Sequence, residues 1–362
     1  MIILLSAIAG VFLFLQLIFL YGIRKSSVRH VKNNATGNRG YFSIVIAARN
    51  EEKNLSRLLD SLLAQSYPLK LYEILLCDDH SSDRTVEIAL NYKNRLPNLS
   101  IITPEKNEPT GKRSALSRGI AAAKHDRILI TDADCFMGKD WLETLDLYFT
   151  KSTDMLVGQA PLVKDKGFFN GLSCFSNLRS FLIISSSFGL GYPVSAIARN
   201  FGFRKATFQK VGGYKSTEGS LGGDDDLLLK AFITYGCKIN LCNNPEAAVF
   251  SNTIEGTKGY LKQKARHTQA SKFYSAKAKM MLGLWHFPNL LCLFAPVLVP
   301  WYPITGSLFI LKFTVDLLTL HKYQREQNYS FKLHELIFYQ FFYEIFLIIN
   351  YLASRFSKFD WK

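Results

Sequence analysis

Residues 42–52 have the sequence FSIVIAARNEE, an apolar run that ends in polar and charged residues. The apolar part, residues 42–47, is typical of a buried β-strand. Leucines at helical spacing then predict a helix over 55–63, and a second apolar run predicts a strand over 72–77. A strand, a helix and a second strand in this order predict a βαβ unit with parallel strands.

The same alternation continues along the chain. We expect further strands over 99–103 and 127–131, and further helices over 85–92, 112–123 and 139–149. Successive βαβ units with right-handed crossovers predict an α/β domain with a mostly parallel sheet. Ligands of such domains bind at the carboxyl ends of the strands.

Composition narrows the classes of protein that the chain can belong to. Of its 362 residues, 48% are hydrophobic and 14% aromatic, which excludes an intrinsically disordered chain. Its six cysteines form no CxxC pair and no dense framework. This pattern excludes a small disulfide-stapled scaffold and fits a reducing compartment.

Three apolar runs predict membrane helices, because about 20 apolar residues span a bilayer as a helix. Residues 1–23 carry no charge, residues 280–311 contain no Asp, Glu, Lys or Arg, and residues 336–354 contain only Glu344. The second run is interrupted at 300–303 and, extended to Leu320, is long enough for two spans. The first run lacks the basic start and the small-residue cleavage site of a signal peptide, so we expect a membrane anchor.

The net charge of +15 is concentrated beside these apolar runs. Residues 24–32 and 257–279 contain several Lys and Arg and no acid. Basic blocks at membrane borders are typical of the cytoplasmic side and of contact with anionic lipids. We therefore expect the middle of the chain in the cytoplasm, and we exclude a nucleic-acid-binding protein because no matching motif is present.

These patterns predict six regions. They are a transmembrane anchor (1–23), a basic juxtamembrane linker (24–40), the α/β domain (41–255), an amphipathic interfacial helix (256–281), two or three transmembrane helices (282–354) and a basic tail (355–362). Four spans in total would leave the basic tail outside the cytoplasm, against the usual charge rule, so three and four spans both stay open.

Acidic residues follow two strands of the predicted sheet. The strand over 72–77 ends in Asp78 and Asp79, and the strand over 127–131 is followed by Asp132 and Asp134. No GxGxxG or P-loop motif is present, which disfavours a dinucleotide site and a P-loop. A lone DxD is often a helix-capping turn, but with other acids beside it we favour a divalent cation that binds a diphosphate.

Two further motifs lie later in the chain. Residues 222–230 read GGDDDLLLK, and residues 263–267 read QKARH. An acid at the start of a helix can simply complement the helix dipole, but three adjacent acids raise each other's proton affinity. A carboxylate that acts as a base is therefore a natural interpretation of the first motif, whereas the lysines around the second motif fit an interfacial helix.

Together these strings resemble the membrane-bound family 2 glycosyltransferases, which are inverting enzymes with the GT-A fold. The resemblance covers about residues 40–270 and the flanking apolar helices. The strings that carry it are SIVIAARNEE (43–52), EILLCDDHSSDRT (73–85), GKRSALSRGI (111–120), ITDADC (130–135), ARNFGFRKATFQKVGGY (198–214), GGDDDLLLK (222–230) and QKARH (263–267).

The resemblance implies roles in binding a nucleotide-diphosphate sugar. Glu51 and Asp79 would contact the base and ribose, and Lys112 would lie along the nucleotide phosphates. Asp132 and Asp134 would form the DxD motif, with Asp134 as the direct ligand of Mg²⁺ or Mn²⁺.

The resemblance also implies a catalytic base. Asp224 matches it when Asp226 matches the family's later acid, which leaves Gly223 where the family usually has Glu or Asp. A register shifted by one residue would make Asp225 the base. We prefer Asp224 because Asp226-Leu227 and Leu229-Lys230 then align with the family's string.

The last motif matches the family's QxxRW, with Gln263 and Arg266 in the donor site and His267 in place of Trp. Processive synthases use that Trp in the acceptor platform, so we expect one or a few additions to a lipid-linked or membrane-proximal acceptor. Alternatives are a processive polysaccharide synthase of the chitin, cellulose or hyaluronan type, a non-catalytic membrane scaffold, and a transporter. The transporter finds little support, because Glu344, Lys312 and Asp316 are the few charges within the spans, and the last two can pair on one helix face.

Overall fold

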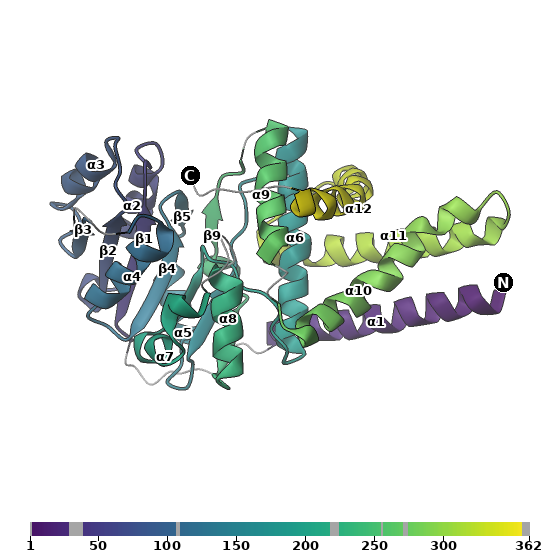
Figure 1. Ribbon diagram of the computed structural model, residues 1–362, viewed down its shortest axis with the longest axis horizontal. Helices are drawn as coiled ribbons and strands as arrows, with labels where there is room; N and C mark the ends of the chain where they lie inside the picture. The colour runs from purple at the N-terminus through teal and green to yellow at the C-terminus, as the bar shows by residue number, and fades with distance from the viewer. Residues whose placement is uncertain are drawn as a thin grey trace. The chain divides into compact units, whose positions relative to one another are not determined.

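The computed structural model describes residues 2–28, 39–105, 109–217, 224–254, 256–270 and 274–356. They divide into two compact units. The α/β unit comprises the described residues between His30 and Val163 and between Ser195 and Thr253, and the helical unit comprises those before Arg29, Lys164–Val194 and those between Ile254 and Ser357. Figure 1 labels the elements of both units.

A seven-stranded sheet forms the centre of the α/β unit, with strand order β3-β2-β1-β4-β7-β6-β8. Strands β1 to β4 are mutually parallel, whereas β7 is antiparallel to both of its neighbours. The predicted mostly parallel α/β fold is therefore confirmed. The strands are β1 (Phe42–Ala48), β2 (Tyr72–Asp78), β3 (Leu99–Ile102), β4 (Arg127–Asp132), β6 (Met155–Gly158), β7 (Phe201–Arg204) and β8 (Ile239–Cys242).

Helices cover this sheet, and a separate two-stranded sheet pairs β5 (Cys135–Met137) with β9 (Val249–Ser251). On one face, Leu55, Leu58, Leu59 and Leu62 of α2 are fully buried in a core shared with Ile44 and Ile46 of β1. Helix α4 packs closely against β1 and β2 at Gly119. A methyl group added there would lie only 2.4 Å from Val45 Cγ1 and 2.5 Å from Cys77 Sγ. The helices are α2 (Leu55–Leu63), α3 (Thr85–Tyr92), α4 (Lys112–Ala122), α5 (Trp141–Tyr148), α7 (Lys205–Lys210) and α8 (Asp224–Thr234).

Six helices form the described part of the helical unit. They are α1 (Ile2–Val28), α6 (Phe168–Gly189), α9 (Gly256–Ala270), α10 (Ala276–Phe294), α11 (Gly306–Tyr323) and α12 (Leu333–Phe356). Two details differ from the predicted regions. Residues 164–194, which include α6, fall inside the predicted domain 41–255 but group with the helical unit. The predicted helix over 256–281 consists of α9 and the start of α10.

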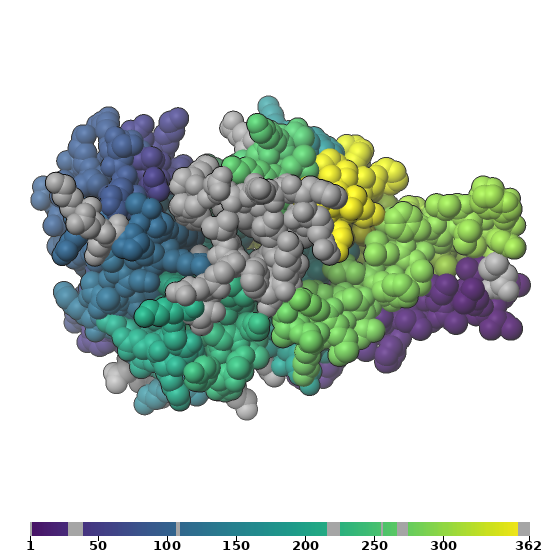
Figure 2. All heavy atoms as spheres, in the orientation of Figure 1, coloured from purple at the N-terminus to yellow at the C-terminus, as the bar shows by residue number. Residues whose placement is uncertain are grey.

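Four of these helices are long and apolar enough to cross a membrane. They cover Ile2–Ser27, Ala276–Leu298, Pro303–Tyr323 and Leu333–Ala353. The predicted apolar helices at both ends of the chain are therefore confirmed. In Figure 2, α1 (purple) and α10–α11 (light green) form much of the visible surface of this unit, and Leu17, Ile310 and Leu318 on them are about two-thirds exposed. Residues 29–38 of the predicted linker and 357–362 of the predicted tail lie outside the described residues.

A charged cluster is buried within the helical unit. Lys312 Nζ lies 2.6 Å from Asp316 Oδ2, the predicted pair on one helix, and 2.7 Å from Glu344 Oε1 on α12. Arg179 of α6 lies 3.3 Å from the same Asp316 oxygen, and Gln340 donates to both carboxylates. The two positive and two negative charges of this cluster thus join α6, α11 and α12.

Candidate active site

The carboxyl ends of β1, β2 and β4 meet at one edge of the sheet. Their register pairs Ala48 with Asp78 and Ala47 with Asp132. The acids that follow two separate strands in the sequence therefore lie at a common edge, as the parallel arrangement requires.

Asp79 is buried at this edge, with 2% of its surface exposed. Its carboxylate accepts hydrogen bonds from Gly111 N at 2.8 and 3.0 Å, and Arg49 Nη1 lies 3.7 Å away. Gly111 has a φ of 121°, which favours glycine, and it directly precedes α4. Asp79 therefore fixes the start of the helix that carries Lys112.

Lys112 points at the DxD motif. Its Nζ lies 2.5 Å from Asp132 Oδ1, and both side chains are partly exposed. The ammonium therefore lies beside the acids of this motif, where it can also bind the phosphate oxygens of a ligand.

Asp134 is partly buried in the turn after β4. Burial raises the pKa of its carboxyl, and the neighbouring Asp132 carboxylate raises it further. Arg57 donates to the backbone carbonyl of Asp134 at 3.3 Å and so fixes the turn after β4. A bound cation would offset both causes of the raised pKa, so these two carboxylates fit a divalent metal.

The described residues contain no cluster of three or more His, Cys, Asp or Glu side chains that could hold a metal alone. Mg²⁺ and similar hard cations commonly bind one or two carboxylates and complete their shell with substrate phosphates and water. The two carboxylates of Asp132 and Asp134 fit a site in which phosphate oxygens and water complete the shell of the cation.

Glu51 belongs to a pair of interlocked loops. Its backbone N–H donates to Thr85 Oγ1 at 2.8 Å, and its carboxylate accepts from Asn54 at 2.8 Å. Asn50 has a φ of 54°, and its side chain accepts from Ser82 N at 2.9 Å. The loops after β1 and β2 therefore hold each other, a contact that the sequence alone did not reveal.

The acids at the start of α8 bind the segment 195–198. Asp225 Oδ2 accepts from Ala198 N at 2.8 Å, and Asp226 Oδ1 accepts from Ser195 Oγ at 2.7 Å and from Ala196 N at 3.0 Å. Asp224 begins the helix, but its side chain lies outside the described residues.

Two residues after this segment were not singled out in the sequence. Arg199 donates to Ser251 Oγ and, at 2.7 Å, to the Ala160 carbonyl. Asn200 is buried and donates to the carbonyls of Gln159 and Ala247, both at 2.7 Å. Both belong to the string 198–214 that carried the resemblance, which is the signal that could have found them.

The remaining motif lies on α9 of the helical unit. Gln263 is half-buried there. The side chains of Arg266 and His267 lie outside the described residues, so their predicted roles stay predictions.

Comparison with known proteins supports a common origin of the α/β region. Over 108 residues, 30% of this chain, it is 32% identical to glycosyltransferase AglE of Haloferax volcanii. Over 143 residues, 39% of this chain, it is 32% identical to the 4,4'-diaponeurosporenoate glycosyltransferase of Staphylococcus aureus. The chain covers 35% and 37% of the lengths of these two relatives.

The fold is similar to that of a solved structure, the mannosyltransferase PcManGT of Pyrobaculum calidifontis in complex with GDP-Man and Mn²⁺. The TM-score is 0.58 at 17% sequence identity, over 98% of this chain and all of that one. The model of the family "Glycosyl transferase family 2" matches residues 43–212. The strings 222–230 and 263–267 lie outside this match. Within it the match confirms the resemblance, and residues 43–212 belong to glycosyl transferase family 2.

Proposed function

We propose that the protein is a membrane-bound, inverting glycosyltransferase. It moves a sugar from a nucleotide-diphosphate sugar to a lipid-linked or membrane-proximal acceptor, in one or a few additions. The observation that carries this proposal is the group formed by Lys112, Asp132 and Asp134 at the carboxyl edge of the sheet. Four helices able to span a membrane lie in the same chain.

The donor would bind at this edge. Lys112 supplies a positive charge for the phosphates, and Asp134, with Asp132 beside it, would hold Mg²⁺ or Mn²⁺. Such a cation stabilises the charge that develops on the leaving diphosphate. Glu51 and Asp79 would lie at the base and ribose, where the interlocked loops give a rigid wall. The GDP-Man and Mn²⁺ in the solved mannosyltransferase are ligands of this class.

The base would be Asp224. Asp225 and Asp226 accept hydrogen bonds from the segment 195–198, which supports a positioning role for these two acids. The carboxylate of Asp224 takes the proton of the acceptor hydroxyl while that oxygen attacks the anomeric carbon. The bond to the diphosphate breaks as the new glycosidic bond forms, and this single displacement inverts the anomeric configuration.

The acceptor would enter from the membrane. The relative from Staphylococcus aureus is named a 4,4'-diaponeurosporenoate glycosyltransferase, and the four apolar helices of this chain support an acceptor at the membrane. The basic blocks beside the apolar runs support a cytoplasmic catalytic domain, where nucleotide sugars are available. The resemblance of the motif 263–267 also assigns Gln263 and Arg266 to donor binding.

A panel of nucleotide sugars tests this proposal. The purified full-length protein should hydrolyse at least one donor slowly, and a membrane lipid extract should accelerate donor use. Asp134→Ala and excess EDTA should each remove this activity while the melting temperature of the protein without metal stays the same. Activity that persists in EDTA would contradict the metal-dependent mechanism, and no hydrolysis of any donor would contradict the proposed reaction.

A further inference from the structure

Helix α2 makes two kinds of contact. Its buried leucines pack against the sheet, whereas Arg57, Ser61 and, just past the helix, Gln65 contact the segment that follows the DxD motif. These three residues are four apart in the sequence and so lie on one side of the helix. Ser61 Oγ lies 2.9 Å from Met137 Sδ, and Gln65 Nε2 donates to the Gly138 carbonyl at 2.8 Å. The polar row therefore holds β5 and the residues that flank it.

Arg57 is the member of this row that reaches the DxD motif. Its Nη2 donates to the backbone carbonyl of Asp134 at 3.3 Å, and its Nη1 donates to Asn252 Oδ1 at 3.4 Å. The guanidinium also lies 4.2 Å from the centroid of the Phe136 ring. One planar side chain on α2 thus contacts the turn after β4, the strand β5 and the residue that follows β9.

These contacts bear on Asp134 because the turn that carries it leads directly into β5. β5 pairs with β9, and the rings of Phe136 and Phe250 stack across this pair with their centroids 5.5 Å apart. Cys135 lies on the other face of β5, in the core of the unit. The strand after Asp134 is therefore held on both faces, and Arg57 extends this support to the turn itself.

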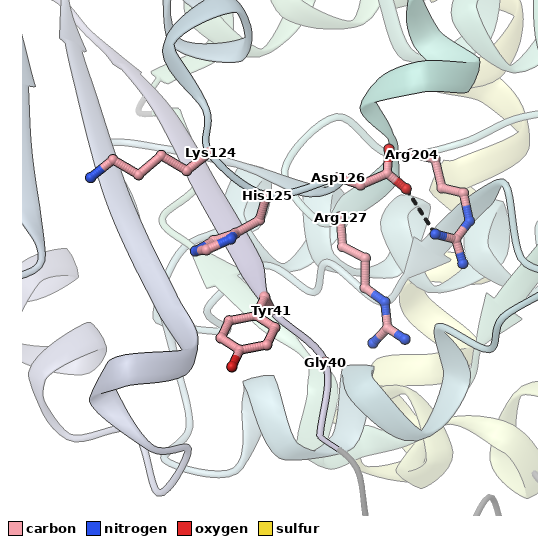
Figure 3. A pocket seen from close by; sticks show the side chains of 7 residues that line it. All are labelled: Gly40, Tyr41, Lys124, His125, Asp126, Arg127 and Arg204. Carbon is pink, nitrogen blue, oxygen red and sulfur yellow. Dashed lines mark hydrogen bonds and ion pairs between the residues drawn. The ribbon is translucent and has the colours of Figure 1, made fainter.

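Arg57 differs from the arginines of the α/β unit that pair with an acid. Arg204, at the opposite edge of the sheet from the DxD motif, pairs with Asp126 at 2.8 Å, as the dashed line in Figure 3 shows. No Asp or Glu oxygen of the described residues lies within 4 Å of the Arg57 guanidinium. Its hydrogen bonds go to a carbonyl and an amide oxygen, so the fork of the guanidinium fixes two segments in place rather than balancing a charge.

We propose that Arg57 is a positioning residue for the divalent cation of the donor site. It acts through Asp134, whose backbone it holds so that the carboxylate keeps one direction at the carboxyl edge of the sheet. Loss of a group that orients a metal ligand typically lowers the affinity for the metal by about 10- to 100-fold. This inference rests on the proposed function, because it needs a cation at Asp134.

Titration of Mn²⁺ tests the proposal in the full-length protein in detergent, with free Mn²⁺ measured by electron paramagnetic resonance. Arg57→Met should weaken Mn²⁺ binding by about tenfold or more. Arg57→Lys keeps the charge but has no planar fork to bind two oxygens, so it should also weaken binding, and it serves if Arg57→Met does not fold. Asp134→Ala gives the level of Mn²⁺ binding at other sites.

The sign of the change separates position from charge. A positive side chain near the carboxylates repels a cation. If Arg57 acted through its charge alone, Arg57→Met would tighten Mn²⁺ binding and Arg57→Lys would leave it unchanged. Tighter or unchanged binding in Arg57→Met would therefore overturn the proposal.

Two controls separate the role of Arg57 from a general loss of stability. Gln65→Met removes a donor of the same row, which binds Gly138, four residues after Asp134. Arg204→Met removes an arginine that binds three backbone carbonyls at the opposite edge of the sheet. Both should lower the melting temperature without metal and leave the affinity for Mn²⁺ unchanged. An affinity that falls in step with the melting temperature across all variants would contradict a positioning role.

The same titration distinguishes this proposal from the proposed function. If the unmodified protein and Asp134→Ala bind Mn²⁺ equally, the donor site holds no cation, and the metal-dependent function fails together with the role of Arg57. If Asp134→Ala weakens binding and Arg57→Met does not, the metal site is supported and only the role of Arg57 is overturned.

Discussion

Asp225 and Asp226 show why a string of three acids needs a structure before roles can be assigned. Both use carboxylate oxygens on the segment 195–198, which the sequence separates from them by more than twenty residues. Such contacts depend on how the chain folds back, and no local pattern encodes them. The DxD acids differ, because their place at a strand end follows directly from the apolar run before them.

The first prediction concerns the base. Asp224→Asn should keep donor affinity within a few-fold and lower turnover by about 10²–10⁴, the usual scale for a lost general base. Asp225→Asn should lower turnover less and reduce stability, since an amide oxygen is a weaker acceptor for Ala198 N. Steady-state kinetics and thermal unfolding of both variants check this. If only Asp225→Asn abolishes turnover, the shifted register is correct.

At the scale of elements, the first four strands and their helices follow the predictions to within one or two residues. The apolar pattern was sufficient to predict these elements because β1, β2 and β4 are buried on both faces and α2 is buried on one. The helix α6 was missed as a separate element, because its side chains are apolar or small on nearly all faces and Arg179 is its only charge. Its membership of the helical unit depends on packing against α1, which no local pattern shows.

The second prediction tests this packing of α1 against α6. A Cβ at Gly22 would lie 2.5 Å from the carbonyl oxygen of Ser186, so the two backbones are in close contact. Gly22→Leu should destabilise the protein by about 1–3 kcal/mol or more, the cost of overpacking. Gly10→Leu on the same helix is the control, because nothing lies within 4 Å of a Cβ there. Equal denaturation midpoints for both variants in detergent would contradict the close contact.

The third prediction concerns the buried charges that join α6, α11 and α12. Lys312→Met leaves Asp316 and Glu344 with Arg179 as the remaining cation, and removal of one partner from a buried pair costs about 3–5 kcal/mol. Lys312→Met/Glu344→Gln removes one charge of each sign and should recover most of this stability. Chemical unfolding of the two variants checks the expectation, and a double variant as unstable as the single one would show that charge balance does not matter.

At the scale of the molecule, the direction of α12 bears on the number of spans. In Figure 1, α1, α10 and α11 lie lengthwise in the view, whereas α12 is seen nearly end-on. If the first three cross the bilayer, α12 lies closer to the membrane plane, with a lipid-facing row that includes Ile337, Phe341 and Ile345. Three spans would then keep the basic tail in the cytoplasm, as the positive-inside rule favours.

The fourth prediction follows from this arrangement. Reporter fusions after Ile46, after Lys279 and after Lys362 should all report the cytoplasm. A reporter between α10 and α11, after Pro300, should report the opposite side. An external signal after Lys362 alone would mean that α12 crosses the bilayer, and an external signal after Lys279 would contradict the proposed orientation of the catalytic domain.

The last prediction concerns product length and depends on His267. A processive enzyme must hold its growing product between turnovers, and stacking on an aromatic ring supplies about 1 kcal/mol beyond area burial in comparable pairs. An imidazole at this position offers less stacking area than the Trp of the processive synthases. Three or four spans also provide little protein to enclose a polymer.

The product should therefore dissociate after one or a few additions. With donor in excess over a membrane-extracted acceptor, mass spectrometry should show discrete products that differ by single sugar units. His267→Trp should shift this distribution towards longer products if acceptor stacking limits length, and His267→Phe is the matched aromatic control. A high-molecular-weight polymer from the unmodified protein at limiting enzyme concentration would mean that the chain is a processive synthase despite this substitution.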